Sequence, residues 1–185
     1  RPQRPLMASR KSAAVAVAAT VTSPAAMPET FVGLGANLGQ PAAQLHAAVL
    51  ALAALPGTQV KNVSSFYRSA AIGPAGQPDY CNAVAQLETA LEPTTLLDAL
   101  QAIETAAGRV RGERWGARVL DLDLLLHGDT VCNSERLTLP HPEIAQRAFV
   151  LVPLAEIAPD CVIPTQGKLQ QLLSRLPSTR LERWA

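Results

Sequence analysis

Residues 120–126 read Leu-Asp-Leu-Asp-Leu-Leu-Leu, and this segment constrains the fold more than any other. A short apolar run of this kind predicts a buried strand. Residues i and i+2 of a strand point to the same face, so Asp121 and Asp123 would project side by side. Two neighbouring carboxylates in apolar surroundings are unfavourable unless a cation neutralises them. The chain must therefore build a sheet that presents a paired acidic site from a leucine-rich strand.

Three other strands and two amphipathic helices are predicted around this segment. The predicted elements are, in order, a strand at 31–35, a helix at 41–55, strands at 60–67 and 80–87, a helix at 93–107 and a strand at 119–126. The order β-α-β-β-α-β predicts an α+β fold with a ferredoxin-like core, an antiparallel-rich sheet with the helices packed on it. C-terminal additions should follow, namely a short strand at 130–132, a loop and helix at 140–149, and a helix at 169–176.

Size and composition narrow the class of protein. The chain has 185 residues, 48% of them hydrophobic and 17% charged, which fits one globular domain that we place at residues 29–185. A net charge of +1 argues against nucleic acid or a membrane surface as partner, and no apolar run approaches the roughly 20 residues that span a bilayer. Cys81, Cys132 and Cys161 form no Cys-x-x-Cys pair, which favours reduced thiols in the cytoplasm. We expect a cytoplasmic monomer with small-molecule substrates.

Residues 1–28 differ from the rest of the chain, because they are rich in Ala, Ser, Thr and Pro and contain basic but no acidic residues. A transit peptide has this composition, and residues 13–19 are weakly compatible with a secretory signal. We favour a disordered N-terminal extension before a domain that starts near Met27, because Met27 leads directly into the first strand.

Four arginines precede the acidic strand within ten residues, at Arg109, Arg111, Arg114 and Arg118. Guanidinium groups bind phosphate oxygens in pairs, and magnesium takes one or two carboxylates together with substrate phosphates. The combination predicts a magnesium-dependent enzyme that transfers phosphate from ATP. A solvated basic loop, with salt bridges from the arginines to the aspartates, is the alternative. Trp115 in the same loop could pack on a substrate or anchor the loop.

Tyr80 and Asn82 share one face of the strand at 80–87. An aromatic ring beside a carboxamide suits a flat heterocycle, with stacking from the ring and a paired donor and acceptor from the amide. A half-buried tyrosine and a turn-forming asparagine would leave the same pattern. His141, six residues before Arg147, is compatible with a phosphate contact or with a structural role.

Two common nucleotide-binding motifs are absent from the sequence. Gly33, Gly35 and Gly39 have the wrong spacing for the dinucleotide fingerprint, and a glycine-bounded strand end before a helix explains them. Gly167 and Lys168 lack the earlier glycine and the following Ser or Thr of a P-loop. ATP would therefore have to be held in another way.

Two other classes of protein were weighed. An RNA-binding ferredoxin-like module exposes aromatic side chains on its central strands, but this chain has only three Phe, two Tyr and two Trp, with no such cluster. A nucleotidyl or glycosyl transferase could use the Asp-x-Asp pair, but it would leave Tyr80 and Asn82 unexplained.

Six segments taken together resemble the 6-hydroxymethyl-7,8-dihydropterin pyrophosphokinase family of folate biosynthesis. They are Gly-Ala-Asn-Leu-Gly at 35–39, Ser-Ser-Phe-Tyr-Arg-Ser at 64–69, Gly-Pro-x-x-Gln-Pro-Asp-Tyr-x-Asn at 73–82, Gly-Arg-Val-Arg at 108–111, Glu-Arg-Trp-Gly-x-Arg-x-Leu-Asp-Leu-Asp at 113–123 and Leu-Pro-His-Pro at 139–142. The resemblance runs from about Phe31 to Leu176, and the segment at 113–123 is its most specific part.

This resemblance implies transfer of the β,γ-diphosphate of ATP to the hydroxymethyl group of the pterin, with release of AMP. It implies two magnesium ions on Asp121 and Asp123, with Arg109 and Arg118 completing the catalytic set. The family's pterin-binding residues match Ser69, Ala70, Ile72, Tyr80, Asn82, Trp115 and Phe149. Its ATP-binding residues match Gln101, Glu104, Arg109, Arg111, Trp115, Arg118, Leu124, Arg136, Thr138, His141 and Arg147.

Overall fold

The computed structural model describes residues 26–109, 116–177 and 181–185. The strands of the large sheet are β1 (Glu29–Ala36), β2 (Thr58–Val63), β3 (Tyr67–Ser69), β4 (Tyr80–Thr89), β5 (Asp121–His127) and β10 (Glu182–Arg183). Two small hairpins are formed by β6 (Cys132–Asn133) with β7 (Thr138–Leu139), and by β8 (Val162–Ile163) with β9 (Gly167–Lys168). The helices are α1 (Pro41–Ala53), α2 (Pro93–Ala106), the short 3₁₀ turn η1 (Ile144–Gln146), α3 (Ala148–Ile157) and α4 (Leu169–Arg175).

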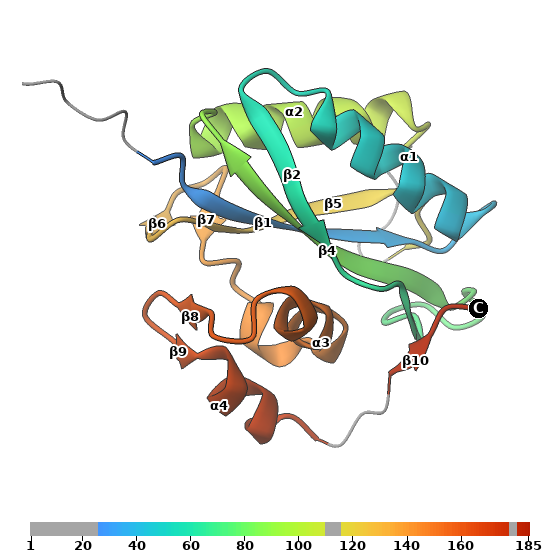
Figure 1. The fold of residues 1–185 in the computed structure, drawn as a ribbon. Coiled ribbons are helices and arrows are strands. Elements are labelled where there is room, and N and C mark those ends of the chain that lie inside the picture. The colour runs from blue at the N-terminus through green and yellow to red at the C-terminus, as the bar shows by residue number, and fades with distance from the viewer. Residues whose placement is uncertain (1–25, 110–115, 178–180) are drawn as a thin grey trace, which may run out of the picture.

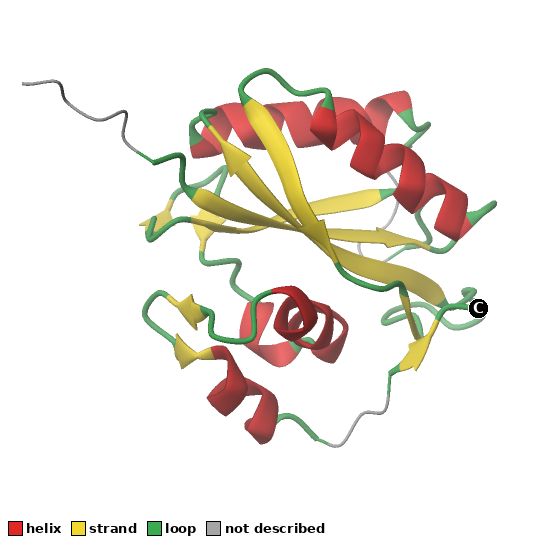
Figure 2. Cartoon of the chain, in the orientation of Figure 1, coloured by secondary structure: helices red, strands yellow, loops and turns green. Residues whose placement is uncertain are grey.

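The large sheet has the strand order β10-β3-β4-β1-β5, with β2 also paired to β4. Every pairing in it is antiparallel. Strands β1, β2, β4 and β5, with helices α1 and α2 between them in the chain, form the split βαββαβ unit. This confirms the predicted ferredoxin-like core. Helices α1 and α2 cover one face of the sheet, and α3 and α4 lie on the other, as Figures 1 and 2 show.

Two hydrophobic clusters fix this three-layer arrangement, one on each side of the sheet. The first packs Leu45 of α1 and Leu100 of α2 against Leu122 of β5. The second packs Leu151 of α3 against Phe31 of β1 and Leu125 of β5. The C-terminal additions therefore form a second helical layer. In the part of the chain that the structure describes, no helix is both long enough and apolar enough to cross a membrane.

The strand predicted at 60–67 is in fact two strands, β2 and β3, which both pair with β4. The reason lies in Ser64, which is buried between them. Its backbone N–H donates to the Val84 carbonyl at 2.9 Å, and its side-chain Oγ accepts from the Val84 N–H at 3.0 Å. A side-chain oxygen thus replaces a backbone carbonyl in the ladder, and regular pairing is interrupted.

Further differences concern the C-terminal part of the chain. The short strand predicted at 130–132 lies at Cys132–Asn133 and pairs with β7 instead of returning along β5. The helix predicted to end near Phe149 begins at Ala148 and continues to Ile157. Strand β10 was not predicted, because two exposed polar residues carry no strand signal until β3 offers them a partner.

Candidate active site

The register of three central strands brings the predicted residues into rows. Gly35 of β1 is paired with Asn82 of β4 on one side and with Asp121 of β5 on the other. Gly33, two residues earlier, is paired with Asp123. Because Leu122 belongs to the cluster under α1 and α2, alternation turns both aspartates to the opposite face, where α3 lies.

The two glycines form the floor between the acidic strand and the tyrosine strand. A Cβ atom on Gly35 would lie 3.4 Å from Asn82 Oδ1 and 3.6 Å from Tyr80 Cδ1. A Cβ atom on Gly33 would lie 3.5 Å from the Leu125 side chain. Because glycine has no side chain, Gly33 and Gly35 of β1 leave space above the centre of the sheet. The sequence interpretation had treated these glycines only as a strand end.

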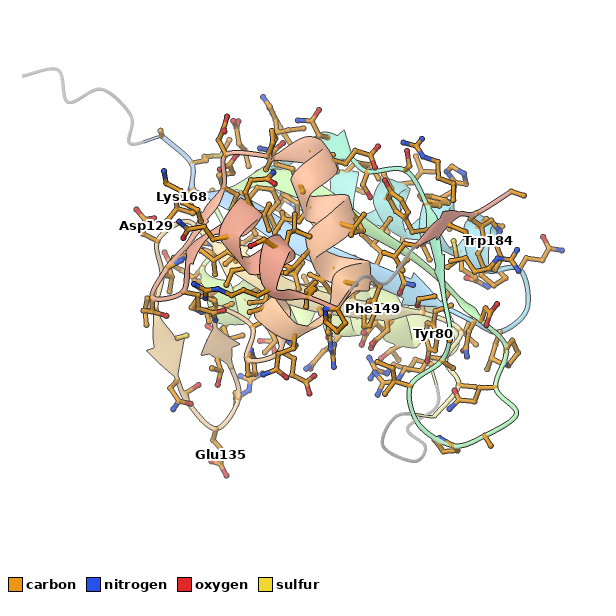
Figure 3. All side chains as sticks on the ribbon, turned by 90° about the horizontal axis from the view of Figure 1, so that it is seen from below. Tyr80, Asp129, Glu135, Phe149, Lys168 and Trp184 are labelled. Carbon is orange, nitrogen blue, oxygen red and sulfur yellow. The ribbon has the colours of Figure 1, made fainter. Side chains whose placement is uncertain are left out.

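A cavity of about 260 Å³ opens above this floor. It is bounded by β1, β3, β4 and β5 and by the segment that leads into α3. Figure 3 shows the labelled Tyr80 and Phe149 on neighbouring elements of the same side of the molecule, away from Asp129 and Lys168. The predicted site residues that line the cavity are Ser69, Ala70, Ile72, Tyr80, Asn82, Arg118, Asp121, Asp123, His141, Arg147 and Phe149.

The acidic pair dominates the electrostatics of one end of the cavity. Burial and the negative charge of Asp121 raise the pKa of Asp123 to about 7. The guanidinium of Arg147 acts in the opposite direction, and its Nη1 lies 3.7 Å from Asp123 Oδ2. The ionised pair is therefore unfavourable in the protein by itself, as expected of a site that is completed by a bound cation.

Two arginines contact Asp121, the first carboxylate of this pair. Arg118 donates to Asp121 Oδ1, and Arg109 Nη1 lies 3.1 Å from the same oxygen. Both arginine side chains are 27% exposed, and of the two Arg118 is among the residues that line the cavity. The salt bridges from the arginines to the aspartates, which the alternative interpretation of this loop predicts, are therefore present. They leave cationic groups where phosphate oxygens would need them.

His141, Glu143 and Arg147 form the wall beside the acidic pair. The backbone N–H of Glu143 donates to His141 Nδ1 at 3.2 Å, so in the neutral ring the proton lies on Nε2. Burial, followed by the charge of Arg147, lowers the pKa of His141. Arg147 also pairs with Glu143 four residues earlier. Glu143 was missed from sequence, although a carboxylate four residues before a candidate arginine was a usable signal.

Neutral polar groups form the other end of the cavity. Asn82 Nδ2 donates to Ser69 Oγ at 2.8 Å across the paired strands β3 and β4. Tyr80 donates its hydroxyl proton to the Gly116 carbonyl at 3.1 Å, and burial raises its pKa. Phe149 lies at the start of α3 with the Arg147 guanidinium 5.5 Å from its ring centre. A planar ligand between two aromatic side chains and an amide would fit these groups.

Asn37 joins the two loops that flank the cavity, and its role was not recognised from sequence. Its Nδ2 donates to the Pro78 carbonyl at 3.0 Å, and its Oδ1 accepts from the Arg118 N–H at 2.8 Å. Its own backbone N–H donates to the Arg118 carbonyl at 3.0 Å. A buried amide that satisfies both loops fixes the distance between Arg118 and the segment before Tyr80.

Other predicted residues lie away from this cavity. Glu104 is buried in α2, where it accepts the Leu122 N–H at 2.7 Å and pairs with Arg109. Leu124 is part of the core under α1 and α2. Gln101 is exposed on α2, and Arg136 pairs with Asp98 on the surface. Thr138 donates to Asn133 within the β6–β7 hairpin. Arg111 and Trp115 lie outside the described residues, as does Arg114.

The donor set was tested for its fit to magnesium. No group of three or more His, Cys, Asp and Glu side chains that could hold a metal occurs among the residues described. Magnesium does not need one, because it is commonly held by one or two carboxylates, with substrate phosphates and water supplying the other oxygens. Asp121 and Asp123 share one strand face in a cavity, and burial together with the charge of Asp121 raises the pKa of Asp123. The residues present therefore fit a magnesium ion that arrives with a polyphosphate.

A ferredoxin-like sheet that carries paired carboxylates, arginines and an aromatic–amide wall defines a class of metal-assisted phosphoryl-transfer site. Comparison with known proteins gives the family. The model of the family described as 7,8-dihydro-6-hydroxymethylpterin-pyrophosphokinase (HPPK) matches residues 31–159, and this chain belongs to that family.

Individual relatives agree with the family match. A 2-amino-4-hydroxy-6-hydroxymethyldihydropteridine pyrophosphokinase from Haemophilus influenzae is 48% identical over 151 residues, which cover 82% of this chain and 94% of that protein. A protein of the same name from Pseudomonas aeruginosa is 49% identical over 153 residues, 83% of this chain and 94% of that protein.

Solved structures give the same fold at much lower sequence identity. A triple mutant of the Plasmodium falciparum HPPK-DHPS has a TM-score of 0.64 and 12% identity. The match covers 80% of this chain but 43% of that longer protein. This likeness supports the observed fold.

Proposed function

We propose that this protein transfers the diphosphate of ATP to 6-hydroxymethyl-7,8-dihydropterin and releases AMP, a step of folate biosynthesis. The observation that carries the proposal is a single cavity with an acidic and arginine-rich end and an aromatic–amide end, in a chain of the HPPK family. The new bond joins the pterin hydroxymethyl oxygen to the β-phosphorus of ATP. The bond from that phosphorus to the oxygen bridging to the α-phosphate breaks, and the hydroxyl proton is released.

The pterin is assigned to the neutral end of the cavity. Tyr80 and Phe149 would hold the ring system by its faces, and the amide of Asn82 would pair with its polar edge. Ser69 fixes the orientation of that amide through its hydrogen bond, and Ala70 and Ile72 complete the wall. In this proposed orientation the hydroxymethyl group of the pterin would face the acidic pair.

The triphosphate of ATP is assigned to the charged end. Asp121 and Asp123 would hold magnesium, for which two ions are expected, and the metal would supply charge neutralisation for the attacking and leaving oxygens. Arg118, Arg109 and Arg147 would bind phosphate oxygens by exchanging their present carboxylate partners for the substrate. His141, with its proton on Nε2, would donate a hydrogen bond to a phosphate.

The other residues assigned to ATP by the family resemblance stay part of the proposal. Glu104 would act by holding Arg109 and the start of β5 in place. The other residues assigned to ATP are Gln101, Arg111, Trp115, Leu124, Arg136 and Thr138, and Trp115 is also assigned to the pterin.

Compartment and assembly follow from the sequence expectations. We propose a cytoplasmic monomer that acts on small molecules and binds no nucleic acid. The three cysteines are unpaired thiols, which suits a reducing compartment.

A direct assay tests the proposed activity. The protein is incubated with ATP, magnesium and 6-hydroxymethyl-7,8-dihydropterin, and the nucleotide products are separated. We expect AMP in an amount equal to the pterin diphosphate and dependent on the pterin. Formation of ADP, or AMP release that does not require the pterin, would overturn the proposal.

A further inference from the structure

Strand β3 is the shortest strand that contributes to the cavity, and it is held from both sides. It has three residues, and it pairs with β4 through Tyr67, Arg68 and Ser69. On its other edge it pairs with the C-terminal strand β10, which adds one further strand to the sheet. Without β10, this short segment would be a frayed edge of the sheet.

The last residue of β3 controls an assigned pterin-binding group. Ser69 is paired with Tyr80, and its Oγ accepts the hydrogen bond from Asn82 Nδ2. That bond is the shorter of two that orient the Asn82 amide, since Nδ2 also donates to the Tyr80 carbonyl at 3.5 Å. A shift of β3 would move Ser69 and so remove the shorter bond, without a change of residue type in the cavity.

Trp184, directly after β10, extends this connection. Its backbone N–H donates to the Phe66 carbonyl at 2.9 Å, just before β3. The Arg68 guanidinium lies 4.8 Å from the centre of the Trp184 ring and reaches Asp79 with an Nη1–Oδ2 distance of 3.8 Å. Asp79 immediately precedes Tyr80.

Both ends of the loop at 70–79 are thus linked to the C-terminal segment, the start through β3 and the end through Arg68 and Asp79. In Figure 3, Trp184 lies on the same side of the molecule as Tyr80, far from Lys168 and Asp129. None of the C-terminal residues Leu181 to Ala185 lines the cavity. Any effect of this segment on substrate must therefore act through β3 and the loop.

We propose that β10 and Trp184 form a positioning clamp for the pterin end of the site, which holds β3 in register so that Ser69 orients the Asn82 amide. This inference rests on the proposed assignment of the pterin to Asn82 and Ser69. Trp184 is a positioning residue, since it touches neither the cavity nor the acidic pair. The clamp should favour pterin binding selectively, because the aspartates of the charged end lie on β5, which pairs with β1. The arginines of that end are held by ion pairs to these aspartates.

Steady-state kinetics with both substrates test the clamp in two variants, Trp184→Ala and a deletion of residues 181–185. We expect KM for 6-hydroxymethyl-7,8-dihydropterin to rise about fivefold to tenfold, which corresponds to about 1 kcal/mol of lost positioning. KM for ATP and kcat should change less than about twofold, as for loss of a substrate-binding interaction that is equal in ground and transition states. Trp184→Phe, which keeps an aromatic face under Arg68, should restore most of the pterin affinity.

The control variant is Leu50→Ala, which truncates an exposed apolar residue on α1 that does not line the cavity. Thermal unfolding of each variant separates positioning from stability. If Trp184→Ala lowers Tm while both KM values stay at the wild-type level, the segment is only structural and the inference is wrong. An equal rise in both KM values would also overturn it.

Asn82→Ala separates failure of the clamp from failure of the proposed site. If Asn82→Ala leaves KM for the pterin unchanged, the assignment of the pterin to this end is wrong. If Asn82→Ala weakens pterin binding and the C-terminal variants do not, the site stands and the clamp is refuted. Combining Ser69→Ala with Trp184→Ala should give less than the sum of the two single effects, because both act on the same hydrogen bond.

Discussion

The two ends of the cavity are stabilised in opposite ways. At the neutral end, Asn82 donates to Ser69, and Tyr80 donates to the Gly116 carbonyl, so the polar groups already have partners. At the charged end, the carboxylates of Asp121 and Asp123 repel each other, and the pKa of Asp123 is raised to about 7 by burial and by this repulsion. The hydrogen bonds of the neutral end are thus satisfied by the protein itself. The carboxylate pair of the charged end is unfavourable when both groups are ionised, and the cation proposed above would neutralise it.

On the proposed assignment, the neutral end would recognise the pterin and the charged end would act on the reacting phosphates. Groups with satisfied hydrogen bonds select a shape and a pattern of donors, and their loss should appear in KM. Carboxylates that hold a metal and arginines that bind phosphate bring positive charge to the charge that develops in the transition state, so their loss should appear in kcat. The following predictions test this division, from the largest expected effect to the smallest.

Replacement of Asp123 should have the largest effect. In Asp123→Ala we expect turnover to fall by at least about a thousandfold, since the metal and the charge it supplies would be lost. The same change removes a repulsive carboxylate, so Tm should stay equal or rise. AMP formation and thermal unfolding measured on Asp123→Ala and the closer isostere Asp123→Asn check both parts. Near-normal turnover in either variant would remove Asp123 from the metal site.

Arg118→Ala should come next, with kcat lowered about a hundredfold, because a preorganised donor for phosphate charge is lost. Arg118→Lys keeps the charge but loses the paired geometry, so it should recover only part of the rate. Arg175→Ala, an exposed arginine in the last turn of α4, is the matched control and should behave as wild type. A change confined to KM for the pterin in Arg118→Ala would contradict the division between the two ends.

Gly35→Val tests the floor of the cavity, which lies between the neutral end and the charged end. Side-chain methyl groups on this residue would enter the space beside Asn82 and Tyr80, where a Cβ alone already reaches contact distance. We expect KM for the pterin to rise about tenfold, with a smaller change in KM for ATP. Gly35→Ala should be milder, because its Cβ lies 3.4 Å from Asn82 Oδ1 and fits without a clash. Equal effects on both substrates would show that the floor does not separate two binding ends.

The smallest effect is expected from Glu156→Gln, a change close to the neutral end of the cavity. It should lower the free energy of unfolding. Glu156 of α3 accepts hydrogen bonds from the Tyr67 hydroxyl at 2.6 Å and from the Ser65 backbone N–H at 3.0 Å. Burial acts to raise its pKa, but the hydrogen bonds from Tyr67 and Ser65 lower it below the ordinary value of 4.5. Because Glu156 is exposed and solvent screens its charge, we expect the variant to lose less than about 1 kcal/mol of unfolding free energy at neutral pH.

The pH dependence of this loss has a defined sign. A carboxylate with a lowered pKa in the folded state contributes stability above its unfolded pKa and loses it as the pH falls through the folded pKa. The difference in urea midpoint between wild type and Glu156→Gln should therefore be largest near pH 7 and shrink below about 4.5. A difference that is constant with pH would show that the charge of Glu156 is not involved.

Much of the architecture could be predicted from periodicity alone. The helices at 41–55 and 93–107 and the strands at 31–35, 80–87 and 119–126 are all present within a few residues. Apolar spacing and the flanking Pro and Gly residues are local signals, so they predict these elements without tertiary information. The break at Ser64 and the pairing of β10 could not be predicted, because each depends on a partner strand far away in the sequence.

The candidate site shows the same limit. The row of Asp121 and Asp123 and the pair of Tyr80 and Asn82 follow from alternation within single strands. That these two pairs face each other across Gly35 follows only from the register of β4, β1 and β5.

The sequence by itself thus determined the chemical groups, the strands that carry them and, through six segments in order, the family they resemble. Three features were decided by the tertiary structure alone. The glycines on β1 leave space at the floor of the cavity, Asn37 joins the two flanking loops, and β10 pairs with β3. The physical reason is that residue type and spacing act over one strand or one helical turn. Cavities, register and edge pairing arise only when segments distant in the chain pack together.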